Sequence, residues 1–518
     1  MGRWSVLLLE AGGDEIPLTD VPLAVPYVIG TDYNWGYTTE PQDGSCLGFE
    51  GARCPWPKGK AVGGTSVINF MVYTRGFPRD YDLWEEAGHH GWGFESVLPY
   101  FKKYEDVRVP SLRESPFYSR GGYLRVERPK WRSPLAVAFL EAGRALGYPA
   151  GDGEGLTAPG FSYVLATTKR GARYSAAKAF LRPVTRRKNL SVAKRARVTK
   201  ILIDPETLRA YGVEFVKHRR YRVVKALKEV ILSAGAINSP QLLMLSGVGP
   251  RRHLEELGIP VLRDSPVGEN LQDHLSMAGL VFFVNESVAV TGRTLLNPRY
   301  LVDYLVDGGG PLALPGGAEA VAFLESGTWD AGRHPDVELV FGPGGLTSGG
   351  GTTFRRAVSR LRPKSRGFIR LKSKNPFRWP LIYSNSFDHP DDLRIMVGAI
   401  RMAIRIASTD PYRRYNSSLL TTPFPMCRHH EFGTDEYWGC TCRVLTTNLN
   451  HQAGTCAMGS VLDSELRVQG VAGLRVVDAS AIPVLPASHT NAVVYMMAEK
   501  AADMIKSYWL PYANSSFN

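Results

Sequence analysis

Residues 474–480 read Leu-Arg-Val-Val-Asp-Ala-Ser, an apolar run that ends in an aspartate. The run predicts a strand. A proline-rich turn leads from it to residues 492–505, where apolar residues recur at helical spacing. A strand that ends in Asp and continues through a turn into a helix is typical of open α/β folds, which bind ligands at the carboxyl ends of their strands. We therefore expect an α/β fold with a site near Asp478.

Two histidines flank this strand in small-residue, loop-like settings. His451 lies in Asn-His-Gln-Ala-Gly-Thr, and His489 lies in His-Thr-Asn immediately before the predicted helix. Histidine is the side chain most easily kept neutral and basic near pH 7, so two of them at one cavity indicate proton transfer. The alternative is two hydrogen-bonded loop histidines in unrelated places, and spacing alone leaves it open.

The composition limits the kind of protein. A length of 518 residues allows two to four domains. No apolar run reaches the ~18 residues of a membrane span, and the apolar start of the chain is too short for a signal peptide because Glu10 follows it at once. The net charge of +13 comes from scattered basic residues, which favours a solvated basic surface over nucleic-acid binding.

Cysteines and glycosylation sequons favour an oxidising compartment. The chain has six cysteines, an even number, and Asn-x-Ser sequons at Asn189, Asn285, Asn416 and Asn514. We therefore expect the full-length protein to be extracellular or in the secretory pathway.

A cluster of metal-ligating residue types has two interpretations. It comprises Cys427, His429, His430, Cys440 and Cys442, whose spacing does not match common zinc patterns. We favour a disulfide such as Cys427–Cys440 over a metal site and predict no bound metal.

Residues 6–9, Val-Leu-Leu-Leu, predict a buried parallel strand that ends at Glu10. In a dinucleotide-binding βαβ unit, an acidic residue at the end of the second strand hydrogen-bonds the adenosine ribose, and the glycine fingerprint lies ~20 residues earlier. Only nine residues precede Glu10, so the fingerprint cannot be present, and if Glu10 is the ribose ligand we expect this chain to lack the first strand, the phosphate loop and the first helix of its cofactor domain. Alternatively, Glu10 merely ends an ordinary strand.

Two further segments carry glycine turns. Residues 59–69 form a glycine-rich turn that enters a helix or tight coil, and glycines there would let the backbone approach a ring or phosphate, although a plain tight turn explains them equally well. Residues 229–232 predict a second buried strand, which feeds a helix that starts at Asn238-Ser239-Pro240 and stops at Gly247.

The rest of the chain differs in pattern. His274 ends a polar loop, where a hydrogen-bonded loop histidine is favoured over a ligand. From residue 276 to residue 443, short β-like runs such as 280–283 and 337–341 alternate with glycine loops. We expect a second, sheet-containing domain that shapes a substrate pocket.

Together these segments resemble the glucose–methanol–choline (GMC) oxidoreductase family, and most closely its insect branch, which is FAD-dependent glucose dehydrogenase-like. The resemblance rests on residues 59–69 with 73–76, on 235–250, on 267–274 and on the segments around His451 and His489. Features that point to the insect branch are Trp35, Cys46, Cys54 and residues 362–367.

The resemblance implies one FAD and oxidation of a CH–OH group of a small alcohol or sugar, with electrons passed on to a quinone or oxygen. FAD would be non-covalent, because Ile68 or a neighbour occupies the position of the flavin-linking histidine of some relatives. It also implies a discontinuous Rossmann-like FAD-binding domain at residues 1–76, 170–275 and 444–508. An α+β substrate-binding domain built on an antiparallel sheet would comprise residues 77–169 and 276–443.

By the same resemblance, His451 is the base that accepts the hydroxyl proton as hydride leaves for flavin N5, and His489 hydrogen-bonds the same oxygen. The residues implied to contact FAD are Glu10 at the ribose, Val62, Gly64, Thr65, Ser66 and Asn69 along the ring and pyrophosphate, Val198 at the adenine, Asp478 and Ala479 at the pyrophosphate and ribityl chain, and Thr490 and Asn491 at the pyrimidine end. The alternative is a truncated or non-catalytic relative that does not retain FAD.

Overall fold

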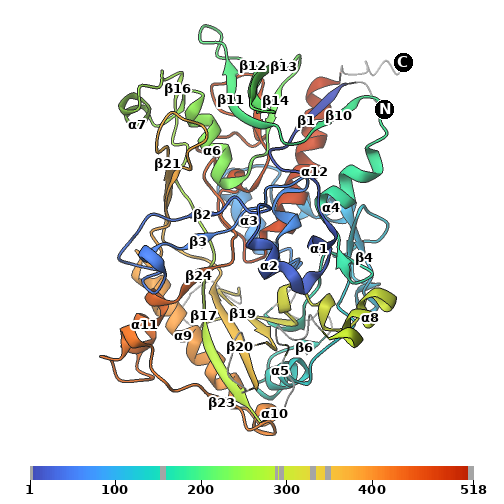
Figure 1. Cartoon of the computed structure of the whole chain (residues 1–518), viewed down its shortest axis with the longest axis vertical. Helices are drawn as coiled ribbons and strands as arrows, with labels where there is room; N and C mark the ends of the chain where they lie inside the picture. Colours follow the sequence, from blue (N-terminus) through green and yellow to red (C-terminus); the bar gives the residue numbers. More distant parts are fainter. Residues whose placement is uncertain are drawn as a thin grey trace.

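A computed structural model describes residues 4–151, 159–285, 290, 297–326, 334–344 and 352–510. An antiparallel sheet lies at one end of the molecule, and pairs of parallel strands with helices α6 (Gly235–Leu245) and α12 (Thr490–Trp509) lie at the other (Figure 1). This arrangement confirms the predicted α/β fold with a second part built on an antiparallel sheet.

The large sheet has eight strands. Along the sheet they are β23 (Ser418–Leu419), β17 (Leu275–Val284), β20 (Thr352–Arg360), β19 (Val337–Gly342), β18 (Ala320–Leu324), β7 (Gly160–Tyr163) and β6 (Ala150–Gly151), and β24 (Thr446–Asn448) also pairs with β17. All neighbours are antiparallel except β6 and β7.

Helices cover one face of this sheet and leave the other for the site. Val337, Leu339 and Phe341 of β19 join a core with side chains of α5 (Pro134–Ala145) and α9 (Pro390–Ala407). Because successive side chains of a strand point to opposite faces, Glu338 lies on the face away from these helices. A charged residue is thus placed on the sheet surface that does not contribute to the helix-covered core.

The other part of the molecule contains two parallel strand pairs, β1 (Val6–Leu9) with β10 (Leu190–Ala193) and β14 (Val230–Leu232) with β25 (Leu474–Val476). An antiparallel unit of β11 (Arg197–Ile203), β12 (Ala210–Lys217) and β13 (Arg220–Lys225) lies beside them. Helix α4 (Phe94–Tyr104) packs against α3 (Pro78–Glu86) and α12.

The remaining described elements are short. The helices are α1 (Pro17–Asp20), α2 (Val25–Ile29), α7 (Arg251–Glu256), α8 (Pro298–Asp307), α10 (Asp410–Arg413) and α11 (Asp435–Val444). The strand pairs are β2 (Tyr37–Thr38) with β3 (Pro55–Trp56), β4 (Glu105–Val107) with β5 (Leu124–Val126), β8 (Thr168–Lys169) with β9 (Ala172–Arg173), β15 (Val248–Gly249) with β16 (Arg263–Asp264), and β21 (Phe368–Arg370) with β22 (Leu381–Tyr383). Within the described ranges, every helix is too short or too polar to cross a bilayer.

The predicted strands at residues 6–9 and 229–232 are present and parallel, but the prediction that they are buried was wrong. Val6 and Leu7 are 53% and 43% exposed, and Ile231 is 47% exposed. Each strand pairs with a single neighbour among the described residues, so one edge of each pair and part of its apolar surface remain open.

Helix α6 begins at Gly235, three residues before the predicted start, and Pro240 lies inside it. The Asp478 carboxylate accepts hydrogen bonds from the Gly235 N–H at 2.9 Å and from the Ser239 hydroxyl, and so caps the helix from the end of β25. Proline lacks the N–H that would bond the carbonyl four residues earlier. The Thr455 hydroxyl donates to that carbonyl, Ala236 O, at 2.7 Å.

The hydrogen bond from Thr455 gives a stability prediction. Thr455→Val should lower the free energy of unfolding by about 1–3 kcal/mol, because the buried Ala236 carbonyl would lose its donor. Urea unfolding followed by fluorescence measures the change. Thr422→Val, at an exposed position, is the matched control and should have an effect below about 0.5 kcal/mol. Equal effects of the two variants would contradict this account of α6.

Candidate functional site

His451 lies in the loop after β24 and is buried by three neighbours. Its N–H donates to Asp273 Oδ1 at 2.8 Å, and its Nδ1 lies 2.8 Å from Nδ1 of His274. The His489 ring stands edge-on, with the ring centroids 4.8 Å apart. The structure therefore brings both predicted histidines together and adds a third.

His274 determines which nitrogen of His451 carries a proton. The carbonyls of Leu361 and Pro486 face the His274 ring as acceptors, although neither meets strict hydrogen-bond geometry at Nε2. In the tautomer that directs the Nε2–H of His274 toward these carbonyls, its Nδ1 accepts. His451 then donates from Nδ1, which leaves a lone pair on its Nε2.

Burial keeps these imidazoles neutral. It lowers the pKa of His274 to about 3, helped by the neighbouring His489. Burial, followed by the proximity of His489, His274 and Lys58, holds the pKa of His451 well below its usual range. Because the charged form is disfavoured, His451 is available as a base at neutral pH.

His489 joins the two parts of the molecule. It is the residue before the first turn of α12, and its N–H donates to Thr74 Oγ1 at 2.8 Å. Its Nε2 lies 2.9 Å from Oε1 of Glu338, which is fully buried on β19. A carboxylate accepts, so Nε2 carries a proton and Glu338 fixes the orientation of the ring.

The segments that carry three of the predicted cofactor residues adjoin one another. Glu10 follows β1, and its Oε1 accepts the Gly12 N–H at 2.6 Å, while burial raises the pKa of its carboxyl. The Val62 N–H donates to the Gly13 carbonyl at 2.8 Å, so the glycine turn lies beside the Glu10 loop. Ala196, two residues before Val198, donates its N–H to the Glu10 carbonyl at 2.8 Å.

The glycine turn continues as a 3₁₀ turn, Gly64–Val67, which contains Thr65 and Ser66. Gly64 has φ 57°, and a side chain built there would meet no atom within 4 Å, so its surface is open. The Asn69 side chain accepts from Arg173 at 2.8 Å and from the Met71 N–H at 3.1 Å. These contacts hold Asn69 in place from both sides.

Asp478 is engaged within the protein. One carboxylate oxygen caps α6, and the other accepts from the N–H and hydroxyl of Ser480. The carbonyl of the adjacent Ala479 accepts the Gly454 N–H at 3.2 Å, which ties this turn to the His451 loop.

Buried polar atoms without partners gather near the histidines. Asn450 Oδ1, Ser488 Oγ and Asn491 Oδ1 have no hydrogen-bond partner among the described residues. Thr490 and Asn491 form the first turn of α12, where no side chain caps the helix. A helix N-terminus with free N–H groups and unpaired polar atoms needs a ligand that both accepts and donates. The residues present therefore fit a flavin cofactor.

Sequence reasoning missed four residues of the site, His274, Glu338, Asp273 and Lys58. Glu338 had a detectable signal, because it is the one charged residue within the apolar run 337–341. His274 and Asp273 belong to the polar loop 267–274, where only a hydrogen-bonded histidine was favoured. That interpretation is confirmed, and the hydrogen-bond partner is His451.

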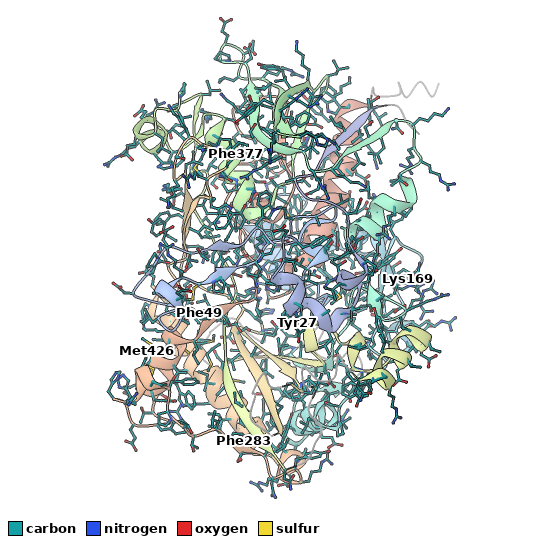
Figure 2. The ribbon with its side chains drawn as sticks, viewed as in Figure 1. Tyr27, Phe49, Lys169, Phe283, Phe377 and Met426 are labelled. Atoms are coloured by element: carbon teal, nitrogen blue, oxygen red, sulfur yellow. A yellow bond between two sulfur atoms is a disulfide. The ribbon has the colours of Figure 1, made fainter. Side chains whose placement is uncertain are left out.

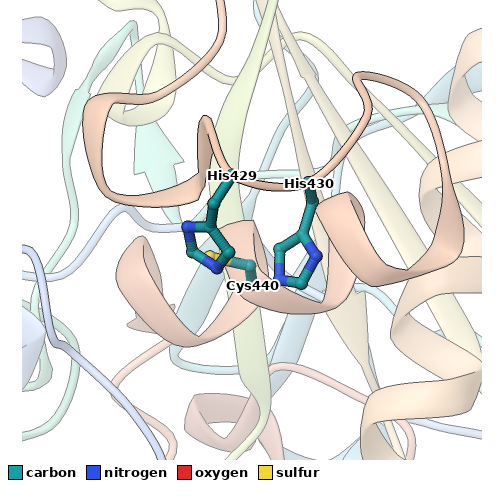
Figure 3. A group of neighbouring side chains, drawn as sticks. All are labelled: His429, His430 and Cys440. Carbon is teal, nitrogen blue, oxygen red and sulfur yellow. The ribbon is translucent and has the colours of Figure 1, made fainter.

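The cysteine-rich cluster contains a disulfide. Figure 3 shows the side chains of His429, His430 and Cys440, whose ligand atoms lie within 4.8 Å of one another. Cys440 is bonded to Cys427, with an S–S distance of 2.07 Å, so its sulfur is not a free thiolate. The favoured disulfide is confirmed. A second disulfide joins Cys46 and Cys54, while Cys442 and Cys456 are free and buried.

Comparison with known proteins identifies the class. Family models described as GMC oxidoreductase match residues 39–276 and 363–498. The chain belongs to this family and is an oxidoreductase. It is 38% identical to a Drosophila melanogaster glucose dehydrogenase (FAD, quinone), over 98% of this chain and 83% of the relative.

Other relatives extend the comparison. An oxygen-dependent choline dehydrogenase of Rhizobium rhizogenes is 36% identical, over 97% of this chain and 91% of the relative. The structure of Aspergillus oryzae formate oxidase, a mutant in which FAD modification was studied, superposes with a TM-score of 0.87 at 25% identity, covering 98% of this chain and 94% of that one. The fold is thus shared along nearly the whole chain.

The buried His274 gives a prediction for stability against pH. Its folded pKa of about 3 lies below the ordinary 6.5, so only the unfolded chain takes up the proton between these values. Wild-type stability should therefore fall as the pH drops below 6.5, with a contribution from His274 on the order of 2 kcal/mol by pH 5. Urea unfolding of wild type and His274→Asn at pH 7.5 and pH 5 measures it.

The control is His218→Asn, at an exposed histidine. This variant should keep the wild-type pH dependence, whereas His274→Asn should reduce it by the contribution of His274 and leave that of another buried histidine, His451. If His274→Asn retained the full wild-type slope, His274 would not be the group that resists protonation.

Proposed function

We propose that this protein oxidises the CH–OH group of a small alcohol or sugar with FAD as its cofactor and a quinone or oxygen as the final acceptor. The observation that carries the proposal is the buried His451, whose charged form is disfavoured and whose Nδ1 is engaged by His274, so that Nε2 is left to face the substrate. The similarity to a glucose dehydrogenase and to choline dehydrogenases supports the substrate class.

The cofactor would be held, non-covalently, by residues 1–76, 170–275 and 444–508. Residues 77–169 and 276–443 would shape the substrate pocket. The contacts to FAD that we propose are Glu10, Val62, Gly64, Thr65, Ser66, Asn69, Val198, Asp478, Ala479, Thr490 and Asn491. For Asp478, whose carboxylate is already engaged, the contact would come from the backbone.

The reaction divides between the two histidines. FAD, when bound, supplies the acceptor for the hydride that leaves the substrate carbon. His451 Nε2 accepts the hydroxyl proton, and His451 can do so at neutral pH because burial keeps it uncharged. A doubly protonated His489, held by Glu338 through Nε2, would donate from Nδ1 to the same oxygen and stabilise its developing negative charge.

We also propose that the full-length protein is extracellular or passes through the secretory pathway. The two disulfides support this location, because such bonds persist in oxidising compartments.

Removing the base tests the function. The purified chain should show a flavin absorbance spectrum with about one FAD per chain, the stoichiometry of a single cofactor domain. A panel of sugars and alcohols should include a compound that bleaches the spectrum. His451→Ala should keep the flavin and slow its reduction by about 10²–10⁴-fold, as expected for loss of a positioned base.

Each outcome of this experiment is informative. If the variant reduced its flavin at the wild-type rate, the assignment of His451 would be wrong. A folded but colourless wild-type chain would support the alternative of a relative that does not retain FAD.

Glu338→Gln tests how His489 works. The amide keeps the size of the side chain but removes its charge, so flavin reduction should slow by about tenfold while bound FAD is unchanged. His489→Ala should be at least as impaired as Glu338→Gln, but less impaired than His451→Ala. Stopped-flow absorbance measures all three rates. The control Glu256→Gln, on exposed α7, should be silent. A wild-type rate in Glu338→Gln would remove Glu338 from the mechanism.

A further inference from the structure

Helix α8 turns its apolar side to solvent. Leu301, Val302, Leu305 and Val306 are 47%, 57%, 70% and 75% exposed. Residues spaced by one and four positions lie on one stripe of a helix. The opposite stripe, which carries Tyr300, Asp303 and Tyr304, is less exposed. The amphipathic pattern of α8 is therefore inverted relative to that of an ordinary surface helix.

This orientation is fixed by contacts at three points. The Tyr304 hydroxyl donates to the Asp20 carbonyl at 3.1 Å, on the inner side of the helix. The Asn297 side chain caps the first turn through the Arg299 N–H, and Gly308 ends the helix with φ 61°. The caps set the two ends of the helix, and the Tyr304 contact holds its inner side against the rest of the molecule, so the four apolar side chains face outward.

Basic residues lie at both ends of α8. Lys130 Nζ donates to the carbonyl of Asp307 at 2.6 Å, at the end of the helix. A side chain built at Gly308 would strike the carbonyl of Arg170, so the backbones of these residues touch. Lys169, next in the chain, lies beside α8 (Figures 1 and 2). Lys130, Lys169, Arg170 and Arg299 are all exposed, against one exposed acidic residue of the helix, Asp307.

We propose that this face of α8 binds the surface of an anionic lipid bilayer. The helix would lie in the interfacial plane, with its four aliphatic side chains in the acyl boundary and the basic rim against the headgroups. Because a lipid bilayer is fluid, it can adapt to the shape of this face and does not need to be complementary to it beforehand. Interfacial binding requires apolar side chains that enter the bilayer and basic residues that attract its anionic headgroups, and α8 with its neighbours offers both.

A second copy of the chain fits this face less well. Four apolar residues are few against the roughly 20–30 residues that each partner contributes to a stable complex. Two copies with a net charge of +13 would also bring their basic rims together. An anionic bilayer complements the same charge.

Vesicle flotation of the purified full chain tests the proposal. We expect binding to vesicles of phosphatidylcholine with phosphatidylserine, weaker binding to phosphatidylcholine alone, and release by high salt. The double variant Leu305→Asn/Val306→Asn should lower the partition coefficient by about tenfold or more. The matched control Tyr221→Asn/Val223→Asn replaces two apolar residues of β13 that are 62% and 59% exposed, and should bind as the wild type does.

Several results would overturn the proposal. These are no flotation of the wild type, equal binding to both vesicles, or equal loss in the control variant. Light scattering of the soluble protein provides a further test. If the wild type were a dimer and the α8 variant a monomer, the apolar face of α8 would bind a second copy of the chain and not a bilayer. Because thermal unfolding should be unchanged by these exposed substitutions, loss of binding through misfolding would be recognised.

Discussion

The buried pair of Lys58 and Asp273 is the constraint on which the site depends. Lys58 Nζ donates to the Asn450 carbonyl at 2.8 Å, and Asp273 accepts the His451 N–H at 2.8 Å. Burial lowers the pKa of Lys58 to about 8 and raises that of Asp273 to about 7, and the attraction between the two groups opposes both shifts. The two groups therefore hold the peptide group between Asn450 and His451 from its carbonyl and its N–H, and so fix the backbone that leads into the proposed base.

Desolvation then separates the roles of the histidines. Three imidazoles lie in contact, and a positive charge on any one disfavours charge on the others. His274 and His451 face each other with neutral nitrogens, whereas His489 alone has a carboxylate, Glu338, at 2.9 Å. The buried Glu338 thus distinguishes His489, the proposed electrostatic partner, from His451, the proposed base, although both are histidines.

The local pattern of apolar residues predicted which helices and strands form. Contacts between residues far apart in the sequence determined where they begin, how exposed they are and which side chains they bring together. Apolar periodicity located α12, β17 and β19, because period is a property of neighbouring residues. The start of α6 depends on Asp478, which lies 243 residues away. The partner of His489 is 151 residues away. Exposure of β1 depends on which strands lie beside it. One sequence carries no direct record of such contacts, so the histidines were predicted and their partners were not.

The register of the antiparallel sheet links packing to chemistry. On β19, Val337 and Leu339 enter the helix-covered core, while Glu338 between them faces His489. Glu338 is aligned with Phe323 on β18 and with Ser359 on β20. A slip of one residue would bury the carboxylate in the apolar core and place an aliphatic side chain at the histidine. The hydrophobic effect on one face of the sheet thus holds the charged group in position on the other.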